Sequence, residues 1–125
     1  MDHAAEETRI AEIVFPGDAN HIKTLFGGEA LKQMDMVASI AATRYCRKVV
    51  VTVSVSKIEF KVPVKVGQLI EFVGKVVKTG STSLTVLVEM FSEDLLTGDR
   101  RLCTTGEFVM VAVDENQKPS KITKA

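Results

Sequence analysis

The second half of the chain alternates between apolar and polar side chains along four long segments, at residues 49–62, 68–78, 82–93 and 99–113. Such alternation is typical of β-strands, because successive side chains of a strand point to opposite faces of a sheet. Short segments rich in Pro, Gly, Ser and Asp separate the four strands. Links of this length predict hairpins, and therefore antiparallel neighbours.

The first of these strands, VVVTVSVSKIEFKV, is predicted to divide its side chains between two faces. Strict alternation places Val49, Val51, Val53 and Val55 on one face. The opposite face then carries Thr52, Ser54, Ser56, Ile58 and Phe60.

The first half of the chain is predicted to form one strand and one long helix. Residues 8–15 are rich in Ile, Val and Phe, which indicates a strand, and Pro16-Gly17-Asp18 end it. A loop then runs to Phe26. From about Glu29 to Tyr45 the chain contains neither Gly nor Pro and is rich in strong helix formers.

This order of elements predicts an α+β fold in which an antiparallel sheet of about five strands wraps one long central helix. The length of 125 residues suits a single domain over residues 1–125. The polar segments at 1–7 and 115–125 are expected to be loose tails. Because such a sheet keeps open edges, we expect the chain to pair with a second copy as a homodimer.

Charge and cysteine content argue against several classes of function. Sixteen basic and sixteen acidic residues give zero formal charge, so no binding to nucleic acid or to a membrane is expected. Cys46 and Cys103 lie far apart without a CxxC motif, which favours reduced thiols over a disulfide or a metal site. The acidic N-terminus is unlike a signal peptide, and no apolar run approaches about 18 residues, so we expect a cytoplasmic protein.

The stretch around the start of the helix holds the candidate chemistry. Gly27 and Gly28 allow a tight turn and a close approach of a ligand to the main chain. The first N–H groups of a helix lack intrahelical acceptors and carry the positive end of its dipole. Asp35 lies seven residues beyond Gly28 among apolar neighbours. We interpret the helix start as the group that polarises a carbonyl, and Asp35 as the base that activates water.

Each of these features also has a simpler interpretation. A mid-helix aspartate is commonly a solvated surface residue, and a glycine pair is commonly a plain turn. Asn20 lies in a loop rich in Pro, Gly and Asp, where it is typical of a turn. His21 suits an exposed loop, and the sequence around Gly80 suits the tip of a hairpin.

Several motifs, taken together, resemble those of one enzyme family. They are DAN-x5-FGG-x6-D at residues 18–35, VVTVSV at 50–55, FKVPVKVG at 60–67, KTGSTS at 78–83 and FVMVAVDENQKP at 108–119. The chain thereby resembles the hotdog-fold acyl-CoA thioesterases, or acyl-CoA hydrolases, of the bacterial YciA type. It is also similar to the cytosolic long-chain acyl-CoA hydrolases of animals. One departure lies in the first motif, where the family often has a glycine and this chain has Lys23.

The resemblance implies hydrolysis of fatty acyl-CoA to a free carboxylic acid and CoA. Asp35 would be the general base, the N–H groups of Gly27 and Gly28 the oxyanion hole, and Asn20 would lie opposite Asp35 from the partner subunit. The implied substrate-binding residues are Phe26, Phe60, Pro63, Lys78, Gly80, Ser81, Thr82 and Ser83. Of these, Lys78 and the turn from Gly80 to Ser83 would meet the CoA moiety. The implied assembly is a hexamer built as a trimer of dimers. CoA enters as part of the substrate, and neither a metal nor another cofactor is implied.

Other functions stay open at this point. A hydroxyacyl-thioester dehydratase of the same fold uses a His–acid pair, and here His21 is the histidine near the helix start. A non-catalytic acyl-CoA sensor would lack the helix acid, which this chain has as Asp35. A purely structural dimerisation domain would not need Asn20, the glycine pair and Asp35 together.

Overall fold

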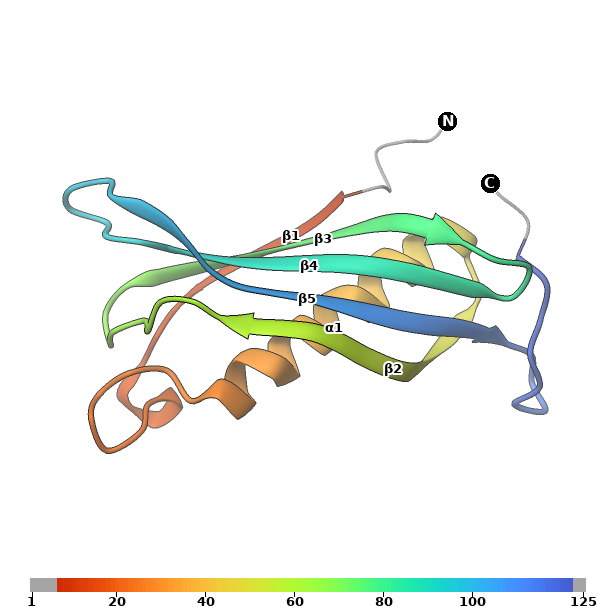
Figure 1. Cartoon of the computed structure of the whole chain (residues 1–125), viewed down its shortest axis with the longest axis horizontal. Helices are drawn as coiled ribbons and strands as arrows, with labels where there is room; N and C mark the ends of the chain where they lie inside the picture. Colours follow the sequence, from red (N-terminus) through yellow and green to blue (C-terminus); the bar gives the residue numbers. More distant parts are fainter. Residues whose placement is uncertain (1–6, 123–125) are drawn as a thin grey trace.

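A computed structural model describes residues 7–122 of the chain. Five antiparallel strands form one sheet in the order β1-β3-β4-β5-β2, and one long helix packs against it (Figure 1). The strands are β1 (Glu7–Ile13), β2 (Val49–Phe60), β3 (Leu69–Thr79), β4 (Ser83–Glu93) and β5 (Arg100–Val113). Helix α1 spans Gly27–Cys46, and a short 3-10 helix, η2, spans Pro16–Asp18. The predicted α+β fold is therefore confirmed.

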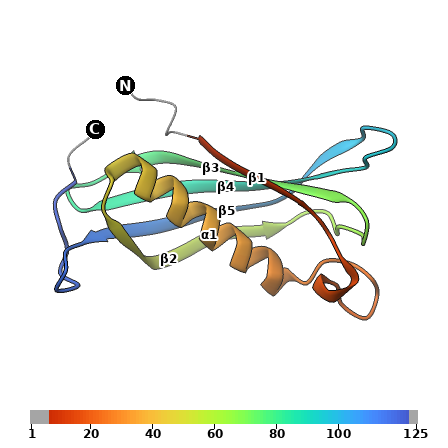
Figure 2. The ribbon, with the colours of Figure 1, turned by 180° about the vertical axis from the view of Figure 1, so that it is seen from behind.

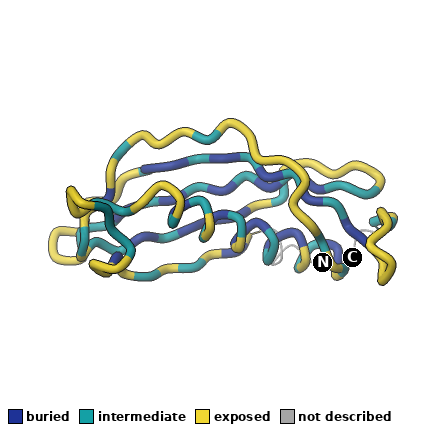
Figure 3. Tube along the Cα trace, turned by 90° about the horizontal axis from the view of Figure 1, so that it is seen from below, coloured by how far each residue is buried: buried dark blue, intermediate teal, exposed yellow. Residues whose placement is uncertain are grey.

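Helix α1 lies across one face of the sheet (Figure 2) and buries one side of itself there. The buried helix residues follow helical spacing, and they are Ala30, Met34, Val37, Ala38, Ala41, Ala42 and Cys46. Close packing also explains Gly74 of β3, where an added Cβ atom would lie 2.8 Å from Cγ1 of Val37. The buried positions concentrate in the middle of the molecule, and the loops at its ends are exposed (Figure 3).

The start of α1 differs from the sequence-based prediction. The helix begins at Gly27 rather than near Glu29, and Phe26 precedes it with extended backbone angles. Neither Gly27 nor Gly28 has a positive φ, so the expected tight turn at the glycine pair is wrong. An added Cβ atom at Gly27 would lie 3.3 Å from the ring of Phe60. Close packing against that ring therefore explains why position 27 is a glycine.

Strand β2 is less regular than its alternating sequence predicted. Thr52 pairs with Met110 and Val55 pairs with Phe108, so Thr52 and Val55 face the same side. The register shifts between Thr52 and Ser54, which marks a bulge that moves the alternation by one residue. The prediction that all four valines share one face is therefore wrong.

The segment after β5 is attached to the sheet. The N–H of Ser120 donates to the carbonyl of Ala112 at 2.8 Å, and the N–H of Ile122 donates to the carbonyl of Ser81 at 2.8 Å. Lys48 donates to the hydroxyl of Ser120 at 2.8 Å. These bonds correct the expected loose tail over residues 115–122, because backbone donors there find acceptors in the sheet. The rest of the expected tails, at 1–6 and 123–125, lies outside the described residues, and Glu7 belongs to β1.

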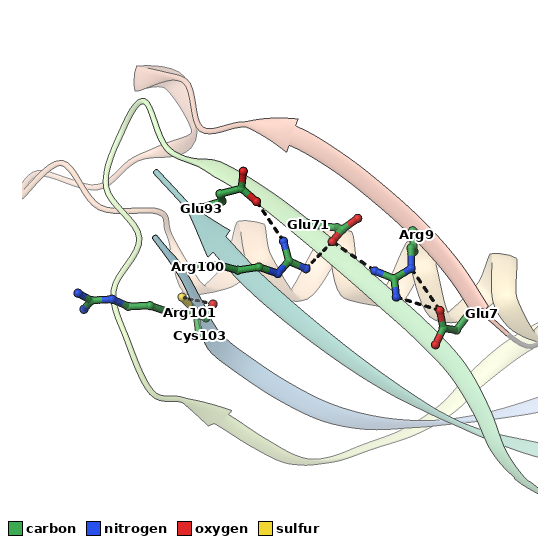
Figure 4. A network of polar contacts seen from close by, with 7 residues as sticks. All are labelled: Glu7, Arg9, Glu71, Glu93, Arg100, Arg101 and Cys103. Carbon is green, nitrogen blue, oxygen red and sulfur yellow. Dashed lines mark hydrogen bonds and ion pairs between the residues drawn. The ribbon is translucent and has the colours of Figure 1, made fainter. Parts of the chain in front are cut away.

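The face of the sheet away from the helix carries a network of ion pairs that joins its strands (Figure 4). Arg9 of β1 and Arg100 of β5 both contact Glu71 of β3, and Arg100 also contacts Glu93 of β4. The guanidinium of Arg100 lies 4.4 Å from the ring centroid of Phe91. Each pair keeps some solvent exposure, so we assign it less than about 1 kcal/mol of stabilisation.

Candidate active site

The start of α1 presents backbone N–H groups that have no acceptor in the described chain. The N–H of Ala30 donates to the carbonyl of Phe26 at 3.0 Å. The N–H groups of Gly27, Gly28 and Glu29 find no acceptor among residues 7–122, and no side chain caps this end. Together with the helix dipole, these groups make a site for an oxygen atom that carries negative charge.

A mainly apolar cavity of about 280 Å³ lies beside this first turn. Its lining comes from the helix start, the loops around it and three strands, and consists of Leu25, Gly27, Ala30, Phe60, Val62, Pro63, Val64, Met90 and Thr104. Phe60, Thr104 and Met90 are direct neighbours across β2, β5 and β4. The structure therefore brings the predicted residues Gly27, Phe60 and Pro63 together around one cavity. Phe26, which precedes Gly27, is 51% exposed.

Asp35 lies farther along α1, on the side that faces β2. Its neighbours in sequence, Met34 and Met36, differ: Met34 is fully buried and Met36 is exposed. Asp35 therefore sits at the border of the buried helix face and is itself half-buried. The hydroxyl of Thr52 donates to Oδ1 of Asp35 at 2.7 Å. This bond fixes one carboxylate oxygen and connects α1 with the edge strand β2.

Asn20 organises its own loop in this chain. Its Oδ1 accepts from the N–H groups of Ile22 at 3.0 Å and Thr24 at 3.1 Å, and its Nδ2 donates to Oγ1 of Thr24 at 2.9 Å. The structure shows no hydrogen bond between Asn20 and Asp35 within the described chain. Lys23, in the same loop, has a φ of 65°. That left-handed conformation is the one glycine adopts most easily, which fits the glycine expected at this position.

The predicted CoA-binding residues lie at the other end of the sheet. Lys78 is near the end of β3, and Gly80 to Ser83 form the hairpin to β4, beyond the C-terminal half of α1 (Figure 1). The turn is tight: the N–H of Gly80 donates to the carbonyl of Ser83 at 2.8 Å, and a Cβ at Gly80 would lie 2.7 Å from Oγ of Ser83. One chain therefore does not bring this hairpin to the helix start.

Glu12 of β1 is the titratable group with the clearest perturbation. Partial burial raises the pKa of Glu12 above its usual value, and the nearby carboxylates of Asp18 and Glu29 raise it further, whereas Lys32 opposes them. Acidic groups thus gather close to the start of α1. No cluster of His, Cys, Asp or Glu among residues 7–122 suits a metal ion, and both cysteines are buried without a disulfide. None of the helices in that range has the length and apolar character needed to cross a membrane.

Sequence reasoning missed two site residues. Thr52 interrupts a run of valines in β2, and that interruption was the available signal for it. Its pairing with Asp35 depends on how β2 meets the helix, which the sequence does not reveal. Thr104 lies in the cavity wall because of its register with Met90 and Phe60, and no local motif marks it.

Comparison with known proteins defines the class to which this fold and site belong. The model of the thioesterase superfamily matches residues 22–98. That match covers more than half of the chain, so the chain belongs to the thioesterase superfamily. The predicted hotdog fold and the predicted resemblance to acyl-CoA thioesterases are both confirmed by the relatives described next.

The relatives are acyl-CoA hydrolases by name. Uncharacterized acyl-CoA thioester hydrolase YkhA of Bacillus subtilis is 37% identical over 111 residues, which cover 89% of this chain and 64% of YkhA. The chain thus spans slightly less than two thirds of the length of that relative. An apo-hexameric acyl-CoA thioesterase superposes with a TM-score of 0.94 at 39% identity, over 97% of this chain and 78% of that chain.

A third relative was solved with ligands. The acyl-CoA hydrolase of Staphylococcus aureus, in complex with butyryl coenzyme A, coenzyme A and coenzyme A disulfide, superposes with a TM-score of 0.92. It is 29% identical to this chain, and the match covers 97% of this chain and 74% of that chain.

Proposed function

We propose that this protein hydrolyses acyl-CoA to a free carboxylic acid and CoA, in the cytoplasm. The observation that carries the proposal is the group of unpaired N–H donors at Gly27 and Gly28 next to an apolar cavity. The donors suit the oxygen of a thioester, and the cavity suits an acyl chain. The butyryl-CoA complex of the Staphylococcus aureus relative supports this choice of substrate class.

In the proposed reaction, Asp35 takes a proton from a water molecule while the water oxygen attacks the thioester carbon. The carbonyl oxygen becomes an oxyanion, which accepts hydrogen bonds from the N–H groups of Gly27 and Gly28. The C–S bond then breaks, the sulfur takes the proton back from Asp35, and the carboxylic acid leaves. Thr52 holds one carboxylate oxygen of Asp35, so the other is available to the water.

The site is proposed to be shared between two subunits. Asp35 lies seven residues beyond Gly28, which corresponds to about 10 Å along an α-helix. If both groups came from one chain, the thioester carbonyl and the water would have to fill the gap between the N–H of Gly28 and the carboxylate of Asp35. These groups would then lie almost in a straight line. A partner packed along β2 offers a shorter path, because its helix start approaches Asp35 from the opposite direction. In this arrangement Asn20 of one subunit lies near Asp35 of the other.

The open edge of β2 supports this assembly. Residues 49–56 contain neither a charge nor a proline, and Val49 and Val53 are 65% and 56% exposed. The opposite edge strand, β1, carries Glu7, Arg9 and Glu12. Charged edges resist pairing, whereas apolar edges invite it, so β2 is the edge we assign to the homodimer. A trimer of such dimers would give a hexamer, the state of one solved relative.

Variants of the Staphylococcus aureus relative support the choice of site residues. Its solved structures include replacements by alanine of an asparagine, an aspartate and a threonine. In that chain the three residues are spaced as Asn20, Asp35 and Thr52 are here, with differences of 15 and 17 positions. The correspondence favours these residues as parts of one site.

The remaining predicted residues are assigned to substrate binding. Phe26, Phe60 and Pro63 would line the acyl groove at the helix start. Lys78 and the hairpin Gly80–Ser83 would contact the CoA portion in a site completed by another subunit, because they lie at the opposite end of the sheet (Figure 1).

The proposal is tested by thiol release from short-, medium- and long-chain acyl-CoAs. We expect the wild type to release CoA, and Asp35→Asn to stay folded while losing about 10²- to 10⁴-fold in rate. Asp99→Asn, at the exposed hairpin between β4 and β5, is the matched control and should keep its activity. Binding of acyl-CoA without thiol release would show a sensor instead. Loss of water from a 3-hydroxyacyl-CoA, again without thiol release, would show a dehydratase.

A further inference from the structure

Thr104 is a buried polar residue whose side chain lacks a hydrogen-bond partner in the described part of the chain. Its exposed fraction is 1%, and its hydroxyl makes no hydrogen bond within residues 7–122. The other buried polar side chains in this range do have partners. Thr8 accepts from Arg44 at 2.9 Å, and Ser92 pairs with the thiol of Cys103 at 3.2 Å. Thr104 is therefore the exception, and a buried hydroxyl without a partner is costly enough to need an explanation.

The position of Thr104 suggests the explanation. It lines the cavity of about 280 Å³ beside the helix start, between its cross-strand neighbours Phe60 and Met90. The other side chains that line this cavity are apolar. Among the side chains of the lining, Thr104 carries the one hydroxyl that could bind a water molecule there, whereas ordered buried waters usually make two to four hydrogen bonds.

We propose that Thr104 is a specificity-determining residue that hydrogen-bonds an oxygen atom on the acyl chain. The inference rests on the proposed thioesterase function and on the assignment of this cavity to the acyl group. The favoured substrates are short acyl-CoAs that carry a hydroxyl or oxo group along the chain. A plain hydrocarbon chain would displace water from the cavity and leave the hydroxyl of Thr104 unpaired. An oxygenated chain would supply the missing partner.

The test compares matched substrates and matched variants. The substrates are butanoyl-CoA, 3-hydroxybutanoyl-CoA, 3-oxobutanoyl-CoA and 4-hydroxybutanoyl-CoA, each followed by thiol release. The variants are Thr104→Val, which keeps the shape and removes the hydroxyl, and Thr104→Ser, which keeps the hydroxyl. Thr105→Val is the control, because Thr105 is the next residue of β5 and points to the other face of the sheet.

We expect at least one oxygenated substrate to exceed butanoyl-CoA in kcat/KM with the wild type. The selectivity ratio is kcat/KM for that oxygenated substrate divided by kcat/KM for butanoyl-CoA. In Thr104→Val this ratio should fall by about tenfold, as expected for one hydrogen bond and its desolvation. Thr104→Ser and Thr105→Val should keep the wild-type ratio. The melting temperature of Thr104→Val should equal or exceed that of the wild type, because it loses an unpaired group.

Two results would overturn the inference. One is that Thr104→Val has the same ratio of kcat/KM for the oxygenated substrate to kcat/KM for butanoyl-CoA as the wild type. The other is a loss of melting temperature in Thr104→Val as large as that in Thr8→Val, whose hydroxyl does have a partner. If the wild type hydrolyses butanoyl-CoA and either result is found, the inference about Thr104 fails alone. If the wild type hydrolyses none of the four substrates, the proposed function fails with it.

Discussion

The hydroxyl of Thr52 donates a 2.7 Å hydrogen bond to Oδ1 of Asp35, across the space between β2 and α1. The same hydroxyl lies 3.2 Å from the sulfur of Met110. The second carboxylate oxygen of Asp35 makes no hydrogen bond within the described part of the chain. Thr52 thus restricts the rotation of the carboxylate while one oxygen stays available, an arrangement that suits the role of general base proposed for Asp35.

Replacement of Thr52 by valine should lower activity without unfolding the protein. A hydrogen bond to a charged group contributes about 1.5–3 kcal/mol, so we expect kcat to fall by about 10- to 100-fold. Thr52→Ser keeps the donor and should recover most of the rate. Steady-state thiol release and a thermal melt of both variants give the comparison. Equal rates for the valine and serine variants would show that the hydroxyl has no role in positioning Asp35.

Replacement of Gly28 by proline should selectively remove one of the proposed oxyanion donors. Proline lacks the N–H group and is tolerated in the first turn of a helix, and an added Cβ at Gly28 meets no atom within 4 Å. Loss of one such donor typically costs about 10²- to 10³-fold in kcat. Gly28→Ala keeps the N–H group and is the matched control. If both variants lose activity equally, the N–H of Gly28 is not a donor to the oxyanion.

A charge on the edge of β2 should disrupt the proposed dimer. Val53 is 56% exposed in the single chain and belongs to the apolar edge assigned to the interface. Val53→Lys should shift the protein toward monomers in size-exclusion chromatography with light scattering, and thiol release should fall with the dimer fraction. Ala11→Lys places the same charge on the opposite edge strand, β1, and should leave the assembly intact. A Val53→Lys protein that stays fully dimeric would contradict the assignment.

Glycine at position 23 should stabilise the protein. Lys23 has a φ of 65°, a conformation that costs a residue with a Cβ roughly 1–2 kcal/mol, whereas glycine adopts it readily. Because glycine also gains freedom in the unfolded chain, we expect a net gain of about 0.5–1 kcal/mol for Lys23→Gly. Lys23→Ala keeps the Cβ and should show no gain. Urea denaturation at one fixed protein concentration measures both, and equal stability of the two variants would contradict the prediction.

The raised pKa of Glu12 predicts a pH-dependent effect on stability. In the unfolded chain this carboxyl titrates at its ordinary value of 4.5, and in the folded protein its pKa is higher. The folded state therefore holds the proton more tightly, and stability is lost as the pH rises from 4.5 through the folded pKa. Glu12→Gln should match the wild type below about pH 4 and melt at a higher temperature near pH 7.

The control for this prediction is Glu115→Gln, in the exposed turn after β5. This variant removes one carboxylate from an exposed turn, and it gives the baseline against which the Glu12→Gln difference is compared. Thermal melts in matched buffers from pH 4 to pH 8 compare the two. If the melting temperatures of Glu12→Gln and the wild type differ by the same amount over this whole pH range, ionised Glu12 does not destabilise the folded state.

Elements with strong local patterns could be predicted from the sequence, and features set by tertiary contacts could not. The period of two along β4 and β5, and the long stretch without Gly or Pro in α1, define those elements directly. The bulge after Thr52 appears only when β2 is paired with β5. In the same way, the attachment of the segment around Ser120 depends on acceptors in distant strands.

The candidate site also combines residues that a local sequence pattern marks with residues that only tertiary contacts bring in. Asp35 and the glycine pair stand out because of their spacing and their unusual neighbours. Gly27 does not form the predicted turn. A glycine at this position instead leaves room for the ring of Phe60. The places of Thr52 and Thr104 in the candidate site depend on strand register and packing. The break in the valine run hints at Thr52, and no local motif marks Thr104.

The shared site is the central claim, and complementation between two defective variants tests it most directly. Gly28→Pro lacks the proposed donor and Asp35→Asn lacks the proposed base, so each variant alone should be nearly inactive. Co-expressed, they should form mixed dimers in which one of two sites has Gly28 from one subunit and Asp35 from the other. Random pairing then predicts recovery of about a quarter of the wild-type rate of thiol release. A mixture no more active than either variant alone would mean that both groups act from the same chain, and would contradict the account.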